Sequence, residues 1–115
     1  MSAVEETRRS VAALHGELTR NGLVAWTQGN VSARVPGEDL VVIKPSGVSY
    51  DELTASSMVV IDLHGERVEG DHAPSSDAAT HAHIYRAMPH VGGVVHTHSP
   101  YATACSPWDQ PPATR

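Results

Sequence analysis

The chain has 115 residues, a length for one small domain, and a net charge of −5 with 40% hydrophobic and 18% charged residues. This composition excludes a membrane-spanning helix, because no apolar run approaches roughly 20 residues, and it argues against nucleic-acid binding, because no basic cluster stands out. The single cysteine, Cys105, excludes an internal disulfide, and the acidic start of the chain is unlike a signal peptide. We therefore expect a cytoplasmic protein.

The first element is predicted to be an amphipathic helix over residues 2–20. Asn21-Gly22 follows it as a helix stop. The apolar residues expected on its buried face are Val4, Val11, Leu14 and Leu18.

Alternating or continuous apolar residues then predict four strands, at residues 31–35, 40–44, 58–63 and 91–98. A hairpin turn at residues 36–39 joins the first two strands, and a short helical stretch is expected around residues 51–56. Residues 70–76 are expected to form a loop. A second helix is predicted over residues 77–88 with Ser75 or Ser76 as its N-cap, and Ser99-Pro100 is typical of the start of a third.

Two His-x-His pairs differ in the geometry that their elements impose. His96 and His98 lie two apart on a predicted strand, so their side chains share a face and can converge on one divalent ion. The alternative is a pair of solvated residues at a strand end. His81 and His83 lie two apart on a predicted helix, rotated by about 200°, and cannot share an ion. We take them as residues of the helix face, with His81 beside Tyr85 and one of the two as a candidate for the wall of the site.

Two polar segments have the composition of anion-binding loops. Ser75-Ser76-Asp77 stands at the start of the second helix, where backbone N–H groups and hydroxyls bind phosphate. The alternative is an ordinary helix cap with an acid in the first turn. Lys44-Pro45-Ser46-Gly47 combines a cation, a hydroxyl and a flexible turn directly after a strand. Taken alone, each segment is better explained as local structure than as a binding site.

Five segments in a fixed order connect these observations to a known family. They are Gly29-Asn30-Val31-Ser32, Ile43-Lys44-Pro45-Ser46-Gly47, Val68-Glu69-Gly70, Pro74-Ser75-Ser76-Asp77 and Gly92-Gly93-Val94-Val95-His96-Thr97-His98-Ser99. With these segments the chain resembles the class II aldolase/adducin family over about residues 3–104, and most closely its L-ribulose-5-phosphate 4-epimerase branch.

The resemblance implies a role for each matched residue. His96, His98 and Asp77 would form the site of a catalytic Zn²⁺ or another divalent metal such as Mn²⁺, and Asp77 would also be the acidic catalytic residue beside the metal. Asn30, Lys44, Ser46, Gly47, Ser75 and Ser76 would hold the phosphate of a small-molecule sugar phosphate. Family epimerases carry aspartate at the Asp77 position and the related aldolases carry glutamate, which favours an epimerase.

The implied reaction is retro-aldol cleavage and re-formation of a carbon–carbon bond in a ketose phosphate, with the metal as Lewis acid. An aldolase performs the same cleavage and releases the aldehyde, and this is the first alternative. A non-catalytic adducin-like binding module or an inactive remnant is the second.

The resemblance also implies the fold and the assembly. We expect a mixed three-layer α/β/α class II aldolase-like domain with a central, largely antiparallel sheet, incomplete at the C-terminus. The family is longer, and its third metal histidine lies downstream of this chain. Residues 1–104 are therefore expected to be the N-terminal part of the domain and residues 105–115 an aberrant or disordered tail. Family members form homotetramers, and neither nucleic acid nor membrane is an expected partner.

Overall fold

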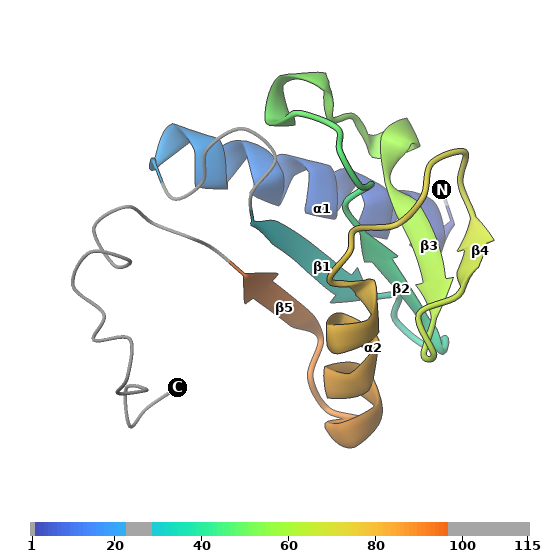
Figure 1. Ribbon diagram of the computed structural model, residues 1–115. Coiled ribbons are helices and arrows are strands. Elements are labelled where there is room, and N and C mark those ends of the chain that lie inside the picture. The colour runs from blue at the N-terminus through green and yellow to red at the C-terminus, as the bar shows by residue number, and fades with distance from the viewer. Residues whose placement is uncertain (1, 23–28, 97–115) are drawn as a thin grey trace, which may run out of the picture.

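Residues 2–22 and 29–96 are described by the computed structural model of the chain (Figure 1). The predicted third helix, His98 and the expected tail at residues 105–115 lie outside the described residues. Within the described ranges the elements are, in chain order, α1 (Ala3–Arg20), β1 (Asn30–Arg34), β2 (Leu40–Ile43), the 3-10 helices η1 (Tyr50–Glu52) and η2 (Ala55–Ser57), β3 (Val59–Asp62), β4 (Arg67–Glu69), α2 (Ala78–Ala87) and β5 (Gly93–His96).

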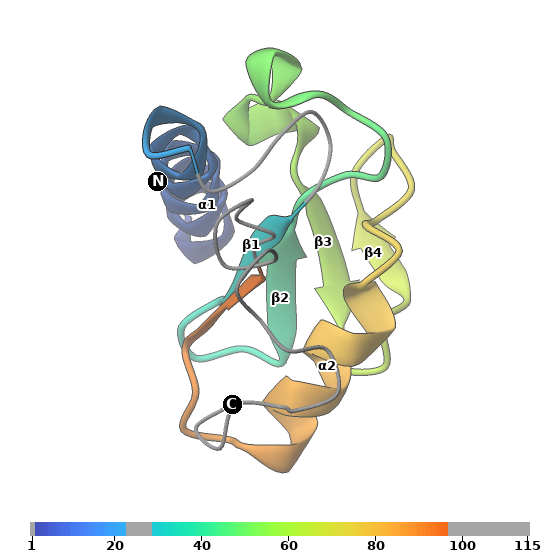
Figure 2. The ribbon, with the colours of Figure 1, turned by 60° about the vertical axis from the view of Figure 1, so that its left-hand side comes forward.

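The strands form one antiparallel sheet in the order β4-β3-β2-β1-β5. β1 therefore lies between β2 and β5, which places the last described strand beside the first. The two helices lie on opposite faces of this sheet (Figure 2). The predicted mixed α/β/α arrangement with a largely antiparallel sheet is thus confirmed.

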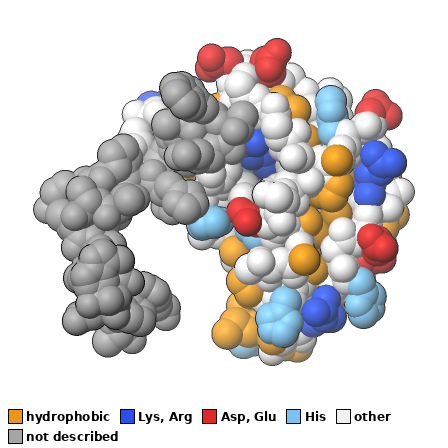
Figure 3. All heavy atoms as spheres, viewed as in Figure 1, with side chains coloured by type: hydrophobic (Ala, Val, Ile, Leu, Met, Phe, Trp, Pro, Cys, Tyr) orange, Lys and Arg blue, Asp and Glu red, His pale blue; other side chains and the backbone are white. Residues whose placement is uncertain are grey.

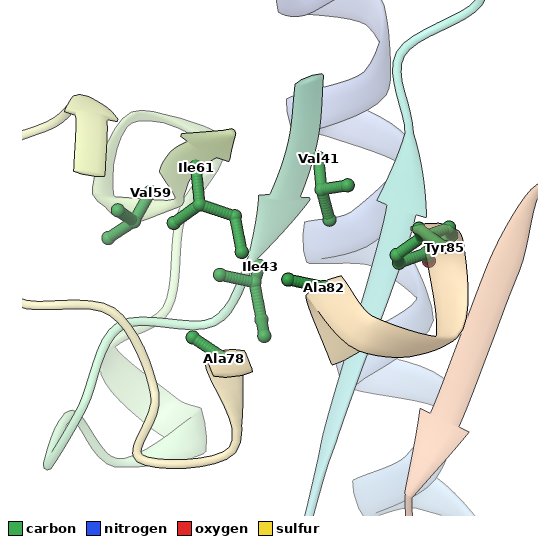
Figure 4. Packing of buried hydrophobic residues seen from close by; sticks show 7 residues of the cluster. All are labelled: Val41, Ile43, Val59, Ile61, Ala78, Ala82 and Tyr85. Carbon is green, nitrogen blue, oxygen red and sulfur yellow. The ribbon is translucent and has the colours of Figure 1, made fainter. Parts of the chain in front are cut away.

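Strand alternation explains how both faces acquire a core, because successive side chains point to opposite sides of the sheet. Val41 and Ile43 of β2 face α2, while Val42 between them faces α1. Figure 4 shows the first two pointing toward Ala78 and Ala82 of α2. Each fully buried side chain of this kind contributes about 1.5–3 kcal/mol of transfer free energy. The cluster on the α2 side consists of Val41, Ile43, Val59, Ile61, Ala78, Ala82 and Tyr85, and that on the α1 side of Val11, Val35, Val42, Met58 and Val60.

Helix α1 forms where it was predicted, but one member of its expected buried face is wrong. Ser2 caps the helix by accepting a hydrogen bond from Glu5 N at 3.1 Å. Leu14 is 46% exposed, whereas His15 is 1% exposed. Successive residues of a helix are rotated by about 100° around its axis. When residue 15 points into the core, residue 14 therefore points toward solvent. The buried residues of α1 are Thr7, Val11, His15 and Leu18.

Two further details differ from the expectation. β4 was not expected, because its three residues are all exposed and carry no apolar alternation. The N-cap of α2 is Asp77 rather than Ser75 or Ser76. The carbonyl of Ser75 accepts a hydrogen bond from Ala78 N at 2.9 Å, which makes a turn before the helix and moves its start to residue 78.

None of the helices that the structure describes is both long enough and apolar enough to span a bilayer.

Candidate functional site

The Asp77 carboxylate joins three elements at the start of α2. Its Oδ2 accepts a hydrogen bond from Asn30 Nδ2 at 2.9 Å and another from His96 Nδ1 at 2.9 Å. Asn30 opens β1 and His96 ends β5, and the two residues are paired across the antiparallel ladder. Their side chains therefore emerge on the same face of the sheet, the face that α2 covers. Figure 3 shows a red acidic side chain next to a pale blue histidine side chain near the middle of the face in view.

Ser75 ties this junction to the loop that follows β2. Its Oγ accepts hydrogen bonds from Asn30 Nδ2 at 3.2 Å and from Asp77 N at 3.2 Å. Its own backbone N–H donates to Lys44 O at 2.9 Å.

The loops at residues 44–47 and 73–76 consequently run side by side. Pro45 and Pro74 form an isolated antiparallel bridge, and Ser46 N donates to Ala73 O at 2.8 Å. Ser46, Gly47 and Ser76 lie at the exposed rim of this double loop. Gly47 has φ +71°, a backbone region that favours glycine and so fixes the turn there.

The charges at the junction are set by its hydrogen bonds. The pKa of Asp77 is lowered, first by the hydrogen bond from Asn30 and further by the hydrogen bond and charge of His96, so the group is a carboxylate at neutral pH. The Lys44 side chain is buried, its Nζ donates to Pro45 O at 3.2 Å, and burial lowers its pKa. It also lies 5.5 Å from the centre of the Tyr50 ring.

A second polar group lies under the junction and was only partly foreseen. Ser32 Oγ lies 2.6 Å from His81 Nδ1 and 2.8 Å from the Tyr85 hydroxyl. His81 is thus next to Tyr85, as predicted from the helix spacing, and His83 is exposed. Sequence reasoning assigned no role to Ser32, whose position on the α2-facing side of β1 was its only signal.

A pocket of about 600 Å³ opens beside these residues. His81 Nε2 and Asn30 Oδ1 are buried without a hydrogen-bond partner among the residues that the structure describes. Orphaned polar atoms of this kind in a polar site are typical of positions where a ligand or ion completes the bonding. The lining residues are Asp77, Thr80, His81, Ile84, Val94, Val95 and His96.

The donors present fit a divalent cation. A carboxylate that accepts from one ring nitrogen of a histidine orients the other ring nitrogen toward a metal, and His96 and Asp77 have this relationship. Within residues 2–22 and 29–96 no group of three or more His, Cys, Asp or Glu side chains is arranged to hold an ion. The second predicted imidazole ligand, His98, lies outside the described residues.

The structure therefore brings four of the predicted site residues into direct contact: Asn30, Ser75, Asp77 and His96. Lys44 contributes its backbone carbonyl to the same network through Ser75 N, and its ammonium group is bonded to the neighbouring loop carbonyl.

Known structures share this fold. An L-fuculose 1-phosphate aldolase has 30% sequence identity and a TM-score of 0.80, with 86% of this chain and 47% of that chain covered. YgbL, a putative aldolase/epimerase/decarboxylase from Klebsiella pneumoniae, has 30% identity and a TM-score of 0.79, with 90% and 49% covered. An aldolase II superfamily protein from Pseudomonas syringae has 29% identity and a TM-score of 0.78, with 87% and 41% covered. The chain spans about half the length of each.

The sequence also matches the family described as Class II Aldolase and Adducin N-terminal domain over residues 9–114. Because this match extends over nearly the whole chain and the fold agrees with the solved structures, the protein is a member of the class II aldolase and adducin family.

Proposed function

We propose that the chain supplies the phosphate-binding loops and part of the divalent-metal site of an enzyme that cleaves a carbon–carbon bond in a phosphorylated sugar. The first candidate is a 4-epimerase of the L-ribulose 5-phosphate type, which re-forms the bond after cleavage. The observation that carries the proposal is the bonding of one carboxylate, Asp77, to both Asn30 and His96. This contact supports the proposal because it joins a proposed metal ligand, His96, to a proposed phosphate-binding residue, Asn30.

The phosphate cradle of this proposal consists of Asn30, Ser46, Gly47, Ser75 and Ser76. Its exposed rim at Ser46, Gly47 and Ser76 offers hydroxyl and backbone groups to an anion. Lys44 lies behind this rim and supplies positive charge to the loop from a buried position.

The metal side of the proposal rests on His96, His98 and Asp77. Bound there, Zn²⁺ or a similar divalent ion would polarise substrate oxygen atoms as a Lewis acid. Asp77 orients the His96 ring through Nδ1 and, as a carboxylate beside the pocket, is the candidate proton acceptor.

An aldolase is the second candidate, because a structure named L-fuculose 1-phosphate aldolase has 30% sequence identity with the chain over the aligned region. Aspartate at position 77 favours the epimerase, and this relative favours the aldolase. The two reactions differ in their product, since the aldolase releases an aldehyde and the epimerase returns a ketose phosphate of inverted configuration. Incubating the chain with L-ribulose 5-phosphate and with L-fuculose 1-phosphate, followed by product analysis, separates them.

The metal half of the proposal is tested by calorimetric titration of the 115-residue chain with Zn²⁺. We expect stoichiometric binding that the double variant His96→Ala/His98→Ala loses. The matched control is His83→Ala, which removes an exposed histidine of α2. Equal binding by all three proteins, or no binding by a folded wild-type chain, would contradict the metal assignment and favour a non-catalytic binding module. A homotetramer, implied by the family, also belongs to the proposal, and sedimentation analysis measures it.

A further inference from the structure

The hydrogen-bond ladder between β1 and β2 has an unusual end next to the phosphate cradle. Val35 N donates to Leu40 O, and Ala33 is paired with Val42, so alternate residues of β1 direct their N–H groups at β2. If the same pairing continued for two more residues, the backbone N–H of Val31 would donate to Lys44 O.

The Lys44 carbonyl is instead the acceptor for Ser75 N, at 2.9 Å. β2 ends at Ile43, and the chain then turns to pair Pro45 with Pro74. The Lys44 carbonyl thus accepts from Ser75 N instead of Val31 N, and this hydrogen bond joins the loop after β2 to the loop before α2. It leaves the buried N–H of Val31 in need of another acceptor, and a buried donor without one costs about 1–3 kcal/mol.

His15 of α1 provides that acceptor. Its Nε2 receives the hydrogen bond from Val31 N at 3.0 Å, and its Nδ1 donates to Val11 O at 2.8 Å in the same helix. The ring is 1% exposed. Burial lowers the pKa of His15 to about 4, so the imidazole is neutral near pH 7 and its Nε2 keeps the lone pair that the bond requires.

A second, partly buried side chain holds the residue on the other side of Asn30. The Tyr50 hydroxyl donates to Gly29 O at 2.7 Å, and its ring centre lies 5.6 Å from that of His15 in a tilted arrangement. The backbone of Asn30 is therefore fixed before and after by two side chains that touch each other. The Asn30 side chain, directed from this fixed backbone, reaches Ser75 and Asp77.

We propose that His15 is a positioning residue of the phosphate cradle, which by accepting the Val31 N–H releases the Lys44 carbonyl to bind and order Ser75. The inference rests on the proposed function for the role of the cradle. The exchange of hydrogen bonds itself is a property of the fold and can be tested without any ligand.

The first experiment measures amide hydrogen exchange in the full 115-residue chain by NMR, comparing wild type with His15→Leu and His15→Gln. Leucine fills the space without an acceptor, whereas the glutamine amide oxygen reaches about as far as Nε2. In His15→Leu we expect Ser75 N–H to lose protection while Val31 N–H stays protected, because Lys44 O returns to its ladder partner. Glutamine should restore the wild-type pattern. Continued protection of Ser75 in His15→Leu would overturn the proposal.

The second experiment titrates inorganic phosphate into the same proteins and adds Val60→Ala as a matched control. Val60 belongs to the core on the α1 side and is 1% exposed, so its truncation lowers stability without touching the cradle. We expect His15→Leu to weaken phosphate binding about tenfold, His15→Gln to recover most of it, and Val60→Ala to leave it unchanged. Equal weakening in His15→Leu and Val60→Ala would mean that His15 is only a core residue, and would overturn the proposal.

The two experiments separate two kinds of failure. If the wild-type chain binds no phosphate while His15→Leu still transfers the Lys44 carbonyl from Ser75 to Val31, the proposed function fails and the positioning role of His15 stands. If phosphate binds and neither protection nor affinity responds to His15→Leu, the proposed function stands and the role of His15 fails.

Discussion

At the scale of single residues, Asp77 carries more of the candidate site than its modest burial indicates. One of its oxygen atoms accepts from an amide on β1 and from an imidazole on β5. Both bonds favour the charged form and lower the pKa of the carboxyl. The residue therefore sets the orientation of His96 and the charge that a cation would meet.

Replacing Asp77 by asparagine keeps the shape of the side chain and removes its charge. We expect Zn²⁺ binding to weaken by about 10–100-fold, the range typical when a metal-ligating histidine loses the group that accepts the hydrogen bond of its other ring nitrogen. Calorimetric titration measures the effect, with Glu38→Gln as control because Glu38 lies in the exposed hairpin turn. Unchanged affinity in Asp77→Asn would show that the carboxylate takes no part in metal binding.

His15 should make the stability of the fold depend on pH. Its pKa falls from 6.5 in the unfolded chain to about 4 in the folded one, so between these values the unfolded state binds more protons. The free energy of unfolding must then decrease as pH falls through this window, by up to about 3 kcal/mol at the lower end.

Urea unfolding at pH 7 and at pH 4.5 measures this dependence. His15→Gln has no titrating group at this position. From pH 7 to pH 4.5 the free energy of unfolding should therefore decrease more for wild type than for His15→Gln. Parallel changes in both proteins would assign the pH dependence to other groups.

At the scale of elements, α1 holds the site from the far face of the sheet. Its buried stripe at Thr7, Val11, His15 and Leu18 alternates polar and apolar residues. The polar members are bonded, since Thr7 Oγ1 donates to Ala3 O at 2.7 Å and His15 is bonded at both nitrogens. The helix thus combines core packing with a hydrogen bond to β1.

Gly16 lies on the exposed side of the same helix, and a methyl group there would meet nothing within 4 Å. Gly16→Ala should therefore stabilise the protein by about 1 kcal/mol through helix propensity alone. Chemical denaturation measures the gain.

Gly70→Ala provides the contrast to Gly16→Ala. At Gly70, with φ +119°, the added Cβ would meet Val59 Cα at 3.3 Å and the Met58 carbonyl oxygen at 3.4 Å. That change should destabilise by about 1–3 kcal/mol. A neutral Gly70→Ala would contradict the described backbone at this turn.

The elements could be predicted from the sequence where periodicity is strong. The alternation at Val31, Ala33 and Val35 and the apolar run before Lys44 placed β1 and β2 within a residue. β4 could not be found this way, because three exposed residues beside one edge of the sheet bury nothing.

The candidate site was predictable only as a set of residue types. Spacing along a strand or helix shows which face a side chain shares with its near neighbours. It contains no information on contacts between distant segments, such as that of Asn30 with Asp77. The burial of His15 was missed because the buried face of the helix was assigned from apolar residues alone, which selected Leu14. The acceptor role of the imidazole could not be predicted either, because its partner lies sixteen positions away in the sequence.

At the scale of the whole molecule, the two edges of the sheet differ in character. β4 carries Arg67 and Glu69, and Glu69 is paired with Arg8 of α1 at 3.0 Å. β5, at the opposite end of the described sheet, carries Val95, which is 60% exposed. Charged edges resist pairing with other chains, whereas apolar ones favour it.

We therefore expect Val95→Lys to reduce concentration-dependent self-association, measured by sedimentation velocity. Val68→Lys is the matched control, because Val68 is also exposed, at 55%, and lies on the charged edge strand β4. An equal effect of both substitutions would point to general solubility rather than to β5.

The pairing of β1 with β5 has a consequence for how the site forms. Because β5 pairs with β1, the contact between Asn30 and His96 closes a long loop of chain, and closing a loop has an entropic cost that increases with its length. A ligand that bridges these segments binds only the closed chain and must stabilise it by mass action. On the proposed function, a bound phosphorylated sugar would hold these distant segments together, and resistance to proteolysis would increase with its concentration.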